Sequence, residues 1–139
     1  MTKLHSGTSI LDLMTGLRAY ATMMNTLDAG AIEPLLADDF HYSSQWVLEE
    51  ITSKQAYLDY IHPKLNAVRE SGTKVWAEMA YLEQEIPGPC VVLAQESKDA
   101  LLSLILGKVA NGKLTRLDMC GAPSPSSAKR SGEYPGLPY

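Results

Sequence analysis

The sequence lacks the features that mark proteins that bind nucleic acid or membranes. It has 12 Lys and Arg against 16 Asp and Glu, a net charge of −4, and no run of basic residues. We therefore expect neither nucleic acid nor an anionic membrane surface as a partner. The longest apolar runs, such as residues 100–106, are far too short to span a bilayer. The first residues lack the basic-then-apolar layout of a secretory signal, and we expect a cytoplasmic protein.

Cysteine and histidine are also scarce. The only cysteines are Cys90 and Cys120, and neither has a histidine nearby at metal-ligand spacing. The strands predicted below place a further strand between the two cysteines. Because neighbouring strands lie about 4.8 Å apart, a gap of two strands is too wide for a disulfide. We expect two buried free thiols, no metal site and no cofactor.

What the chain does contain is the composition of an ordinary globular protein. Of its 139 residues, 45% are hydrophobic and 20% are charged. A chain of this length buries a sizeable core without disulfides. After residue 122, Pro, Ser and Gly become frequent, a composition that cannot build a core. We predict a single domain over residues 1–122, followed by an extended C-terminal tail over residues 123–139.

Three helices are predicted in the first half of the chain. Residues 8–27 carry apolar side chains at steps of three and four. A second, short helix follows over residues 28–36, with Pro34 late enough in it to favour a distorted or 3₁₀-like turn. Thr52 or Ser53 opens the third helix, which ends at Gly72.

The remaining elements are strands. The alternating pattern predicts them over residues 40–48, 74–86, 90–96, 100–110 and 114–120. Asn111 and Gly112 form the pair of residues that a tight hairpin turn prefers. The order α-α-β-α-β-β-β-β predicts an α+β fold in which a curved antiparallel sheet is wrapped on three N-terminal helices.

The first predicted strand has one face of mixed character. The residues on this face are Phe40, Tyr42, Ser44, Trp46 and Leu48. A strand face that combines apolar groups with hydroxyls and an indole suits the wall of a cavity better than a plain core. The same pattern places His41 on the opposite face.

The element order and two sequence segments together resemble the nuclear transport factor 2-like superfamily. The segments are Asp-Ala-Gly-Ala-Ile-Glu-Pro-Leu-Leu-Ala-Asp-Asp-Phe (28–40) and Gly-Lys-Leu-Thr-Arg-Leu (112–117), and the first helix carries a tyrosine. The superfamily includes ketosteroid-isomerase-like and SnoaL-like proteins. The resemblance covers residues 8–121 and implies a cystatin-like cone with an interior cavity. It supports a fold more strongly than a function.

The resemblance to ketosteroid isomerases can be compared residue by residue. It implies a general-base aspartate five residues after Asp39, where this chain has Ser44, and a proton-donating acid eight residues before the turn glycine, where it has Leu104. A first-helix tyrosine completes the isomerase site, and one alignment matches it to Tyr20 whereas another matches it to Met23. Serine is no base for a carbon-bound proton, and leucine offers an enolate no hydrogen bond. A ketosteroid isomerase of the familiar kind is therefore not expected.

Three catalytic candidates remain, all weak. Tyr20 is the possible oxyanion donor. His62 precedes Pro63 and could point toward the mouth of the cone, although a histidine near solvent is the simpler interpretation. Glu78 shares a strand face with Trp76 and could lie in the cavity or on the outer face of the sheet.

Three functions follow from these observations. The first is binding of a small, largely apolar ligand in the cone cavity, without catalysis. The second is a SnoaL-like lyase, isomerase or hydratase that uses tyrosine, histidine and water. The third is a protein-interaction domain with a filled cavity. The predicted ligand-binding residues are Tyr20, Tyr42, Ser44, Trp46 and Tyr57. Because residues 100–106 are apolar on both strand faces, we also expect a homodimer formed through the sheet face.

Overall fold

The computed structural model describes residues 5–84 and 86–138, which form helices and one sheet. The helices and 3₁₀ turns are α1 (His5–Thr26), η2 (Ala29–Ala31), η3 (Glu33–Leu35), α2 (Lys54–Ser71) and η4 (Pro125–Ser127). The strands are β1 (Leu36–Ser44), β2 (Val47–Ile51), β3 (Val75–Leu82), β4 (Gly88–Gln95), β5 (Leu101–Ala110), β6 (Lys113–Cys120) and β7 (Lys129–Arg130).

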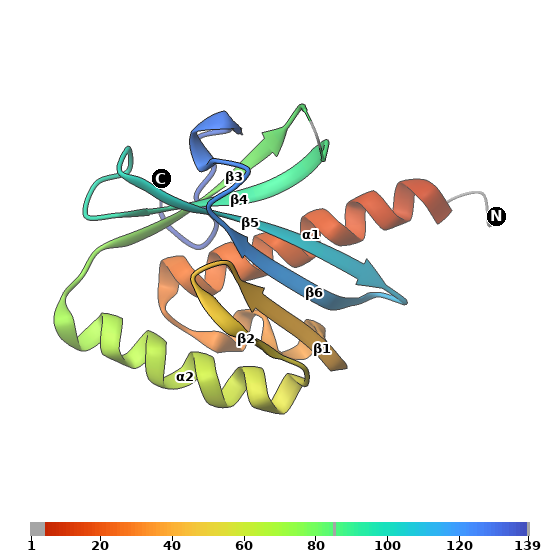
Figure 1. Cartoon of the computed structure of the whole chain (residues 1–139), viewed down its shortest axis with the longest axis horizontal. Coiled ribbons are helices and arrows are strands. Elements are labelled where there is room, and N and C mark those ends of the chain that lie inside the picture. The colour runs from red at the N-terminus through yellow and green to blue at the C-terminus, as the bar shows by residue number, and fades with distance from the viewer. Residues whose placement is uncertain (1–4, 85, 139) are drawn as a thin grey trace.

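The sheet contains all seven strands in the order β2-β1-β6-β5-β4-β3-β7. It is strongly curved, and α1 and α2 pack against the same side of it (Figure 1). The predicted α+β class is confirmed. The predicted all-antiparallel sheet is wrong in one place, because β1 pairs with β6 in parallel. The paired residues lie 75 to 78 positions apart in the sequence, so no turn signal predicts the pairing.

Local signals account for most helix and turn boundaries. The Ser53 hydroxyl accepts a hydrogen bond from the Ala56 N–H (3.1 Å) at the start of α2, and Gly72, at φ 74°, ends that helix. Between β5 and β6, Asn111 and Gly112 both have positive φ (53° and 73°), as the predicted tight hairpin requires. The described residues include no helix long and apolar enough to cross a membrane.

Two predicted elements take a different form. In place of a helix over residues 28–36 there are two 3₁₀ turns, with Pro34 at the start of the second. The predicted strand over residues 40–48 is wrong, because β1 ends at Ser44 and the chain turns back at Gln45 and Trp46 into β2. The Ser44 hydroxyl accepts a hydrogen bond from the Trp46 N–H (3.1 Å), and this contact stabilises the turn.

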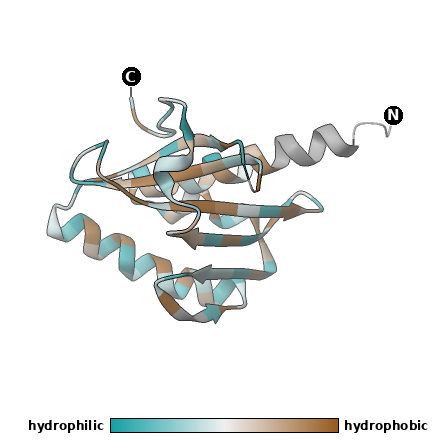
Figure 2. Cartoon of the chain, turned by 45° about the horizontal axis from the view of Figure 1, so that its top comes forward, coloured by the Kyte–Doolittle hydropathy of each residue, from teal (hydrophilic) through white to brown (hydrophobic). Residues whose placement is uncertain are grey.

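The sheet buries apolar residues on both of its faces. The larger core lies between the sheet and the helices; its fully buried members include Leu17, Tyr20, Phe40, Tyr57, Ile105 and Leu117. The smaller core lies on the outer face and contains Ala80, Leu82, Cys90, Val92, Leu104 and Ala128. Figure 2 shows mostly hydrophobic residues along the middle strands, whereas polar and apolar residues alternate along α2. Both thiols are buried and free, as predicted.

The C-terminal segment differs from the extended tail that its composition predicts. β7 pairs with the edge strand β3, and Ala128 and Tyr134 are buried. Arg130 forms an ion pair with the buried carboxylate of Glu78 (2.7 Å), and the Asn25 amide donates to the Pro135 carbonyl oxygen (2.8 Å). The segment is held because an unpaired sheet edge and a buried carboxylate both need partners.

Candidate functional site

Tyrosine rings fill the inner side of the sheet where a cone cavity was predicted. Tyr57 contacts Phe40 and Tyr42 at ring-centroid distances of 5.0 and 5.3 Å, and Tyr42 contacts Tyr60 at 5.7 Å. Tyr20 and Tyr57 are almost completely buried. Three of the five predicted ligand-binding residues, Tyr20, Tyr42 and Tyr57, therefore lie together in this interior. The sheet pocket described below and three smaller pockets in the described part of the chain have none of the five in their walls.

Burial makes these tyrosines poor acids. Desolvation raises the pKa of Tyr20, Tyr42 and Tyr57 above the ordinary value, and neighbouring tyrosines raise it further. The hydroxyls are therefore protonated near neutral pH and can act as hydrogen-bond donors. Among the buried side-chain nitrogens and oxygens that the structure describes, the Tyr57 hydroxyl alone has no hydrogen-bond partner.

The other two predicted ligand-binding residues lie at the edge of this cluster. Ser44 is buried, and its hydroxyl holds the turn that follows β1. Trp46 lies in that turn and is 62% exposed. Its indole N–H donates to the Ser103 hydroxyl (3.4 Å), and its ring covers Gly121, where a side chain would clash with it. The hairpin therefore moves Trp46 out of the face it was predicted to share with Tyr42.

The three catalytic candidates lie in three different parts of the structure. Tyr20 is buried among the tyrosines, and His62 is exposed on α2. Glu78 lies on the outer face of the sheet, where Arg130 and the Gly132 N–H (2.7 Å) both bind its carboxylate. The structure brings no two of these three side chains into a common site.

Leu104, the residue that the resemblance matches to an isomerase acid, does not face the interior of the cone. Leu104 belongs to the outer core, and its neighbours Ser103 and Ile105 lie on the opposite face of β5. The irregularity between Lys108 and Val109 places its extra residue, Thr115, on β6, so the alternation of β5 is unbroken and Ile105, Gly107 and Val109 share its inner face. Counting back eight residues from Gly112 selects Leu104, which faces outward, and neither inward neighbour is an acid.

A network of charged residues occupies the outer face of β1, β2 and β6. Glu50 accepts hydrogen bonds from His41 and Arg116 (2.8 Å each), and Asp118 binds Arg116 and the Ser43 hydroxyl (2.6 Å). The hydrogen bond from His41, supported by Arg116, lowers the pKa of Glu50. His41 thus faces away from the tyrosine interior, as the strand pattern predicted.

A pocket of about 670 Å³ opens through the sheet, and we call it the sheet pocket. β4 and β5 pair over a short stretch only. The first paired residues are Ala94 and Leu101 and the last are Val91 and Ile105, although β5 continues to Ala110. Beyond Val91 the described strands separate. Gly88 and Pro89 of β4 and Gly107 and Lys108 of β5 all line the opening.

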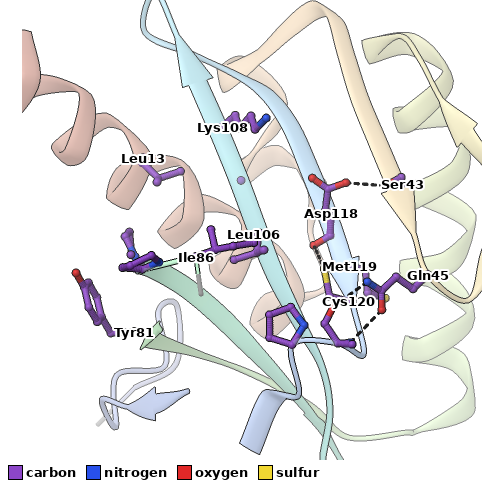
Figure 3. Close-up of a pocket in the computed structure, with 16 residues that line it drawn as sticks. Leu13, Ser43, Gln45, Tyr81, Ile86, Leu106, Lys108, Asp118, Met119 and Cys120 are labelled. Atoms are coloured by element: carbon purple, nitrogen blue, oxygen red, sulfur yellow. Dashed lines mark hydrogen bonds between the residues drawn. The ribbon is translucent and has the colours of Figure 1, made fainter. Parts of the chain in front are cut away.

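The floor and most of the wall of the sheet pocket are apolar. The apolar side chains that line it are Leu13, Ile86, Pro87, Pro89, Leu106, Met119 and Pro123. Leu13 comes from α1, on the inner side of the sheet, and Ile86 from the hairpin between β3 and β4 (Figure 3). Cys120 also lines the pocket, and burial raises the pKa of its thiol, so it is no activated nucleophile.

Sequence reasoning missed this pocket, although one signal was present. The segment Pro87-Gly88-Pro89 leads into β4. Pro89 has no N–H to donate to a neighbouring strand, so a strand that begins there pairs poorly. The rest of the pocket depends on α1 and on residues 118–123, which only the tertiary structure brings to this opening.

The described residues contain no group of three or more His, Cys, Asp or Glu side chains that could hold a metal ion. The chemistry that this chain offers at its two candidate sites is therefore hydrogen bonding and apolar contact. The tyrosine interior supplies hydroxyl donors among rings that contact one another. The sheet pocket supplies an open apolar surface.

Comparison with known proteins identifies the fold. No family model and no curated protein matches the chain. A SnoaL-like protein of unknown function from Burkholderia thailandensis matches at 14% identity and a TM-score of 0.58, over 88% of this chain and 96% of its own. A protein of unknown function with a cystatin-like fold from Methylobium petroleophilum matches at 10% identity and a TM-score of 0.56, over 90% and 88% of the two chains.

A third solved structure carries the superfamily name. It is an NTF2-like protein of unknown function from Cytophaga hutchinsonii, 13% identical, with a TM-score of 0.51 over 76% of this chain and 87% of its own. At these identities the likeness concerns the fold and not the activity. The resemblance found in the sequence is confirmed at that level: this chain has the cone-shaped fold of the nuclear transport factor 2-like superfamily.

Proposed function

We propose that this domain binds a small, largely apolar molecule, and that it does so in the sheet pocket and not in the interior of the cone. The observation that carries the proposal is the separation of β4 from β5 above Leu13 and Leu106, which leaves an apolar opening of about 670 Å³. That volume lies within the range of about 300–1,000 Å³ typical of small-molecule sites.

The packing of the interior supports this choice of site. A ligand in the cone would have to displace rings that already contact one another, such as Tyr42 and Tyr57 (5.3 Å). Close-packed cores resist such insertion. The sheet pocket needs no such rearrangement, because its apolar wall is already open to solvent at Ile86, which is 56% exposed.

Catalysis by tyrosine and histidine has less support than binding. The buried phenols have raised pKa values and are not bases near neutral pH, and His62 is exposed on α2, away from both candidate sites. A general base must come within hydrogen-bond reach of its substrate. Binding without chemistry is therefore the function that the geometry favours.

The proposal is tested with Nile red, an uncharged dye whose fluorescence rises on entering an apolar site. Ile86→Asn removes an apolar group from the pocket wall, and Val47→Asn makes the same kind of change on β2, outside the pocket. The two side chains are matched in exposure, at 56% and 54%, so both variants are expected to fold. Circular dichroism and thermal melting check the fold of each variant.

We expect saturable binding of one dye per chain, weakened about fivefold by Ile86→Asn and unchanged by Val47→Asn, because loss of one partly buried aliphatic group is worth about 1 kcal/mol. Equal affinity in both variants, or binding that does not saturate, would remove the sheet pocket as the site.

A homodimer formed through the sheet is a second proposal, and the exposed apolar residues beside the pocket favour it. Ile86 and Tyr81 are about half exposed, whereas the C-terminal segment already covers part of the outer face through Ala128. A second copy would therefore meet the rim of the sheet pocket. Sedimentation of the wild type and of Ile86→Asn tests this: a dimer that dissociates in the variant supports it, and a monomer at all concentrations contradicts it.

A further inference from the structure

The polar side chains of the sheet pocket differ in whether they already have partners. Asp118 is bound by the Arg116 guanidinium (3.0 and 3.1 Å) and by the Ser43 hydroxyl. Gln45 accepts hydrogen bonds from the N–H groups of residues 121 and 122 and donates to the carbonyl oxygen of Ala122. These groups hold the pocket in shape and have little capacity left for a ligand.

Lys108 is different. Its side chain lines the pocket from β5, is exposed, and has no hydrogen bond or ion pair with any residue that the structure describes. Its ammonium group can donate three hydrogen bonds, while its methylene groups can lie along apolar surface. The pocket therefore has one unpaired cationic group beside its apolar floor (Figure 3).

The negative charge closest to Lys108 in the pocket wall is compensated. Asp118 lies on β6, next to β5, and would repel an anion if it were alone. Arg116 binds both of its carboxylate oxygens, so Asp118 already has a cationic partner, which it shares with Glu50. The chain as a whole carries a charge of −4, but salt screens exposed charges beyond about 10 Å at 0.1 M ionic strength. Among the described residues that line the pocket, Lys108 is therefore the charged group without a partner.

Resting on the proposed function, we infer that the ligand of the sheet pocket is a small amphiphilic anion. Its apolar body lies on Leu13, Leu106 and Ile86, and its carboxylate or a similar acidic group binds the Lys108 ammonium. Tyr81, whose hydroxyl is also without a partner among the described residues, offers a second donor from β3. An uncharged molecule of the same apolar shape gives the Lys108 ammonium no charged partner. A cationic molecule is repelled by it.

Three probes that share an eight-carbon chain test the inference: octanoate, 1-octanol and octyltrimethylammonium. Each is used below its aggregation concentration to displace Nile red near neutral pH, where octanoate is ionised. We expect octanoate to displace the dye at about one tenth of the concentration that 1-octanol needs, because a charge-assisted hydrogen bond typically gives a factor of this size. Octyltrimethylammonium should be the weakest of the three.

Variants of Lys108 separate charge from shape. Lys108→Gln should abolish the preference for octanoate over 1-octanol without changing the affinity for 1-octanol, and Lys108→Arg should keep the preference. The matched control is Lys74→Gln, an exposed lysine just before β3, at the end of that strand opposite Tyr81. It should leave all three affinities unchanged. Because Lys108 is exposed and unpaired, its substitution is expected to leave the fold intact.

The outcomes distinguish this inference from the function on which it rests. Equal displacement by octanoate and 1-octanol, or a preference that survives Lys108→Gln, would overturn the anionic class and leave an apolar site standing. Failure of all three probes, together with dye binding that does not respond to Ile86→Asn, would overturn both. A preference for octanoate that also disappears in Lys74→Gln would mean a general charge effect and would contradict the assignment to Lys108.

Discussion

The Arg130 guanidinium lies 2.7 Å from the carboxylate of Glu78, which is only 3% exposed. The same carboxylate accepts the Gly132 N–H, and Arg130 also binds Asp99 (2.8 Å) and the carbonyl oxygen of Lys98 (2.9 Å). The Glu78 carboxylate thus fastens the C-terminal segment to β3, and Arg130 links that segment to the loop between β4 and β5. Glu78, a weak catalytic candidate from the sequence, has a structural partner in the fold.

We expect Arg130→Ala to lower the free energy of unfolding by about 2 kcal/mol, because it leaves the Glu78 carboxylate buried without its cation. The value is below that of a fully buried pair, since the Arg130 side chain is 31% exposed. Asp99→Asn is the matched control: its side chain is 84% exposed, so it should change stability by less than about 0.5 kcal/mol. Urea denaturation of both variants measures the difference, and equal effects would contradict the role given to Glu78.

Tyr57→Phe should stabilise the protein by about 1 kcal/mol, because the substitution removes a buried hydroxyl that has no partner among the described residues. The ring contacts with Phe40 and Tyr42 are kept. Thermal or urea unfolding measures the change. A loss of stability in this variant would instead mean that a bound water or ligand forms a hydrogen bond with the hydroxyl. The cone interior would then be a candidate ligand site.

Stability should fall as the pH rises above about 10, the ordinary pKa of tyrosine. The pKa of Tyr20 and of Tyr57 is raised in the folded state by burial. These groups therefore stay protonated in the fold while they ionise in the unfolded chain, so the unfolded state binds fewer protons and is favoured as the pH rises. Their contribution is complete below the pKa of the unfolded chain and is lost as the pH rises toward the folded value.

An ultraviolet titration of tyrosinate checks this. The exposed tyrosines should ionise first, and the buried ones only together with the loss of near-ultraviolet circular dichroism. In Tyr57→Phe, the decline of stability with pH should be shallower. Smooth ionisation of all tyrosines while the tertiary signal persists would contradict the buried cluster.

Both thiols should resist alkylation in the native protein. Burial raises the pKa of Cys90 to about 12 and that of Cys120 above its ordinary value, and each is less than a tenth exposed. We expect iodoacetamide to label neither residue in the native state and both in urea, as peptide mass spectrometry would show. Rapid labelling of native Cys120 would mean that the sheet pocket opens more widely than this structure has it.

How far the sequence predicts this protein depends on the range of the interactions involved. Ser53, Gly72 and the Asn111-Gly112 turn act within a few residues of themselves, and the structure has each of them in its predicted role. The helix of residues 8–27 and the last strands follow from the apolar period, which is also a local property. These signals, with the element order, were enough for the fold.

The candidate site followed less well, because it depends on contacts that no local pattern encodes. Trp46 fits the alternation of a single strand, yet Ser44 closes a turn there and the indole lies over Gly121. Leu104 is the position to which the resemblance assigns an acid, yet it lies on the outer face of β5. In a strand, a shift of one residue exchanges the two faces.

By itself the sequence determined the class of fold, the two free thiols, the hairpin between β5 and β6 and the outward direction of His41. Only the tertiary structure decided that β1 pairs with β6 in parallel, that the C-terminal segment closes over β3, and that the open site is the sheet pocket and not the tyrosine interior. The physical reason is sequence separation. Glu78 and Arg130 come into contact, and Leu13 and Lys108 come to line one pocket, only after the sheet has formed, and no local propensity encodes such long-range proximity.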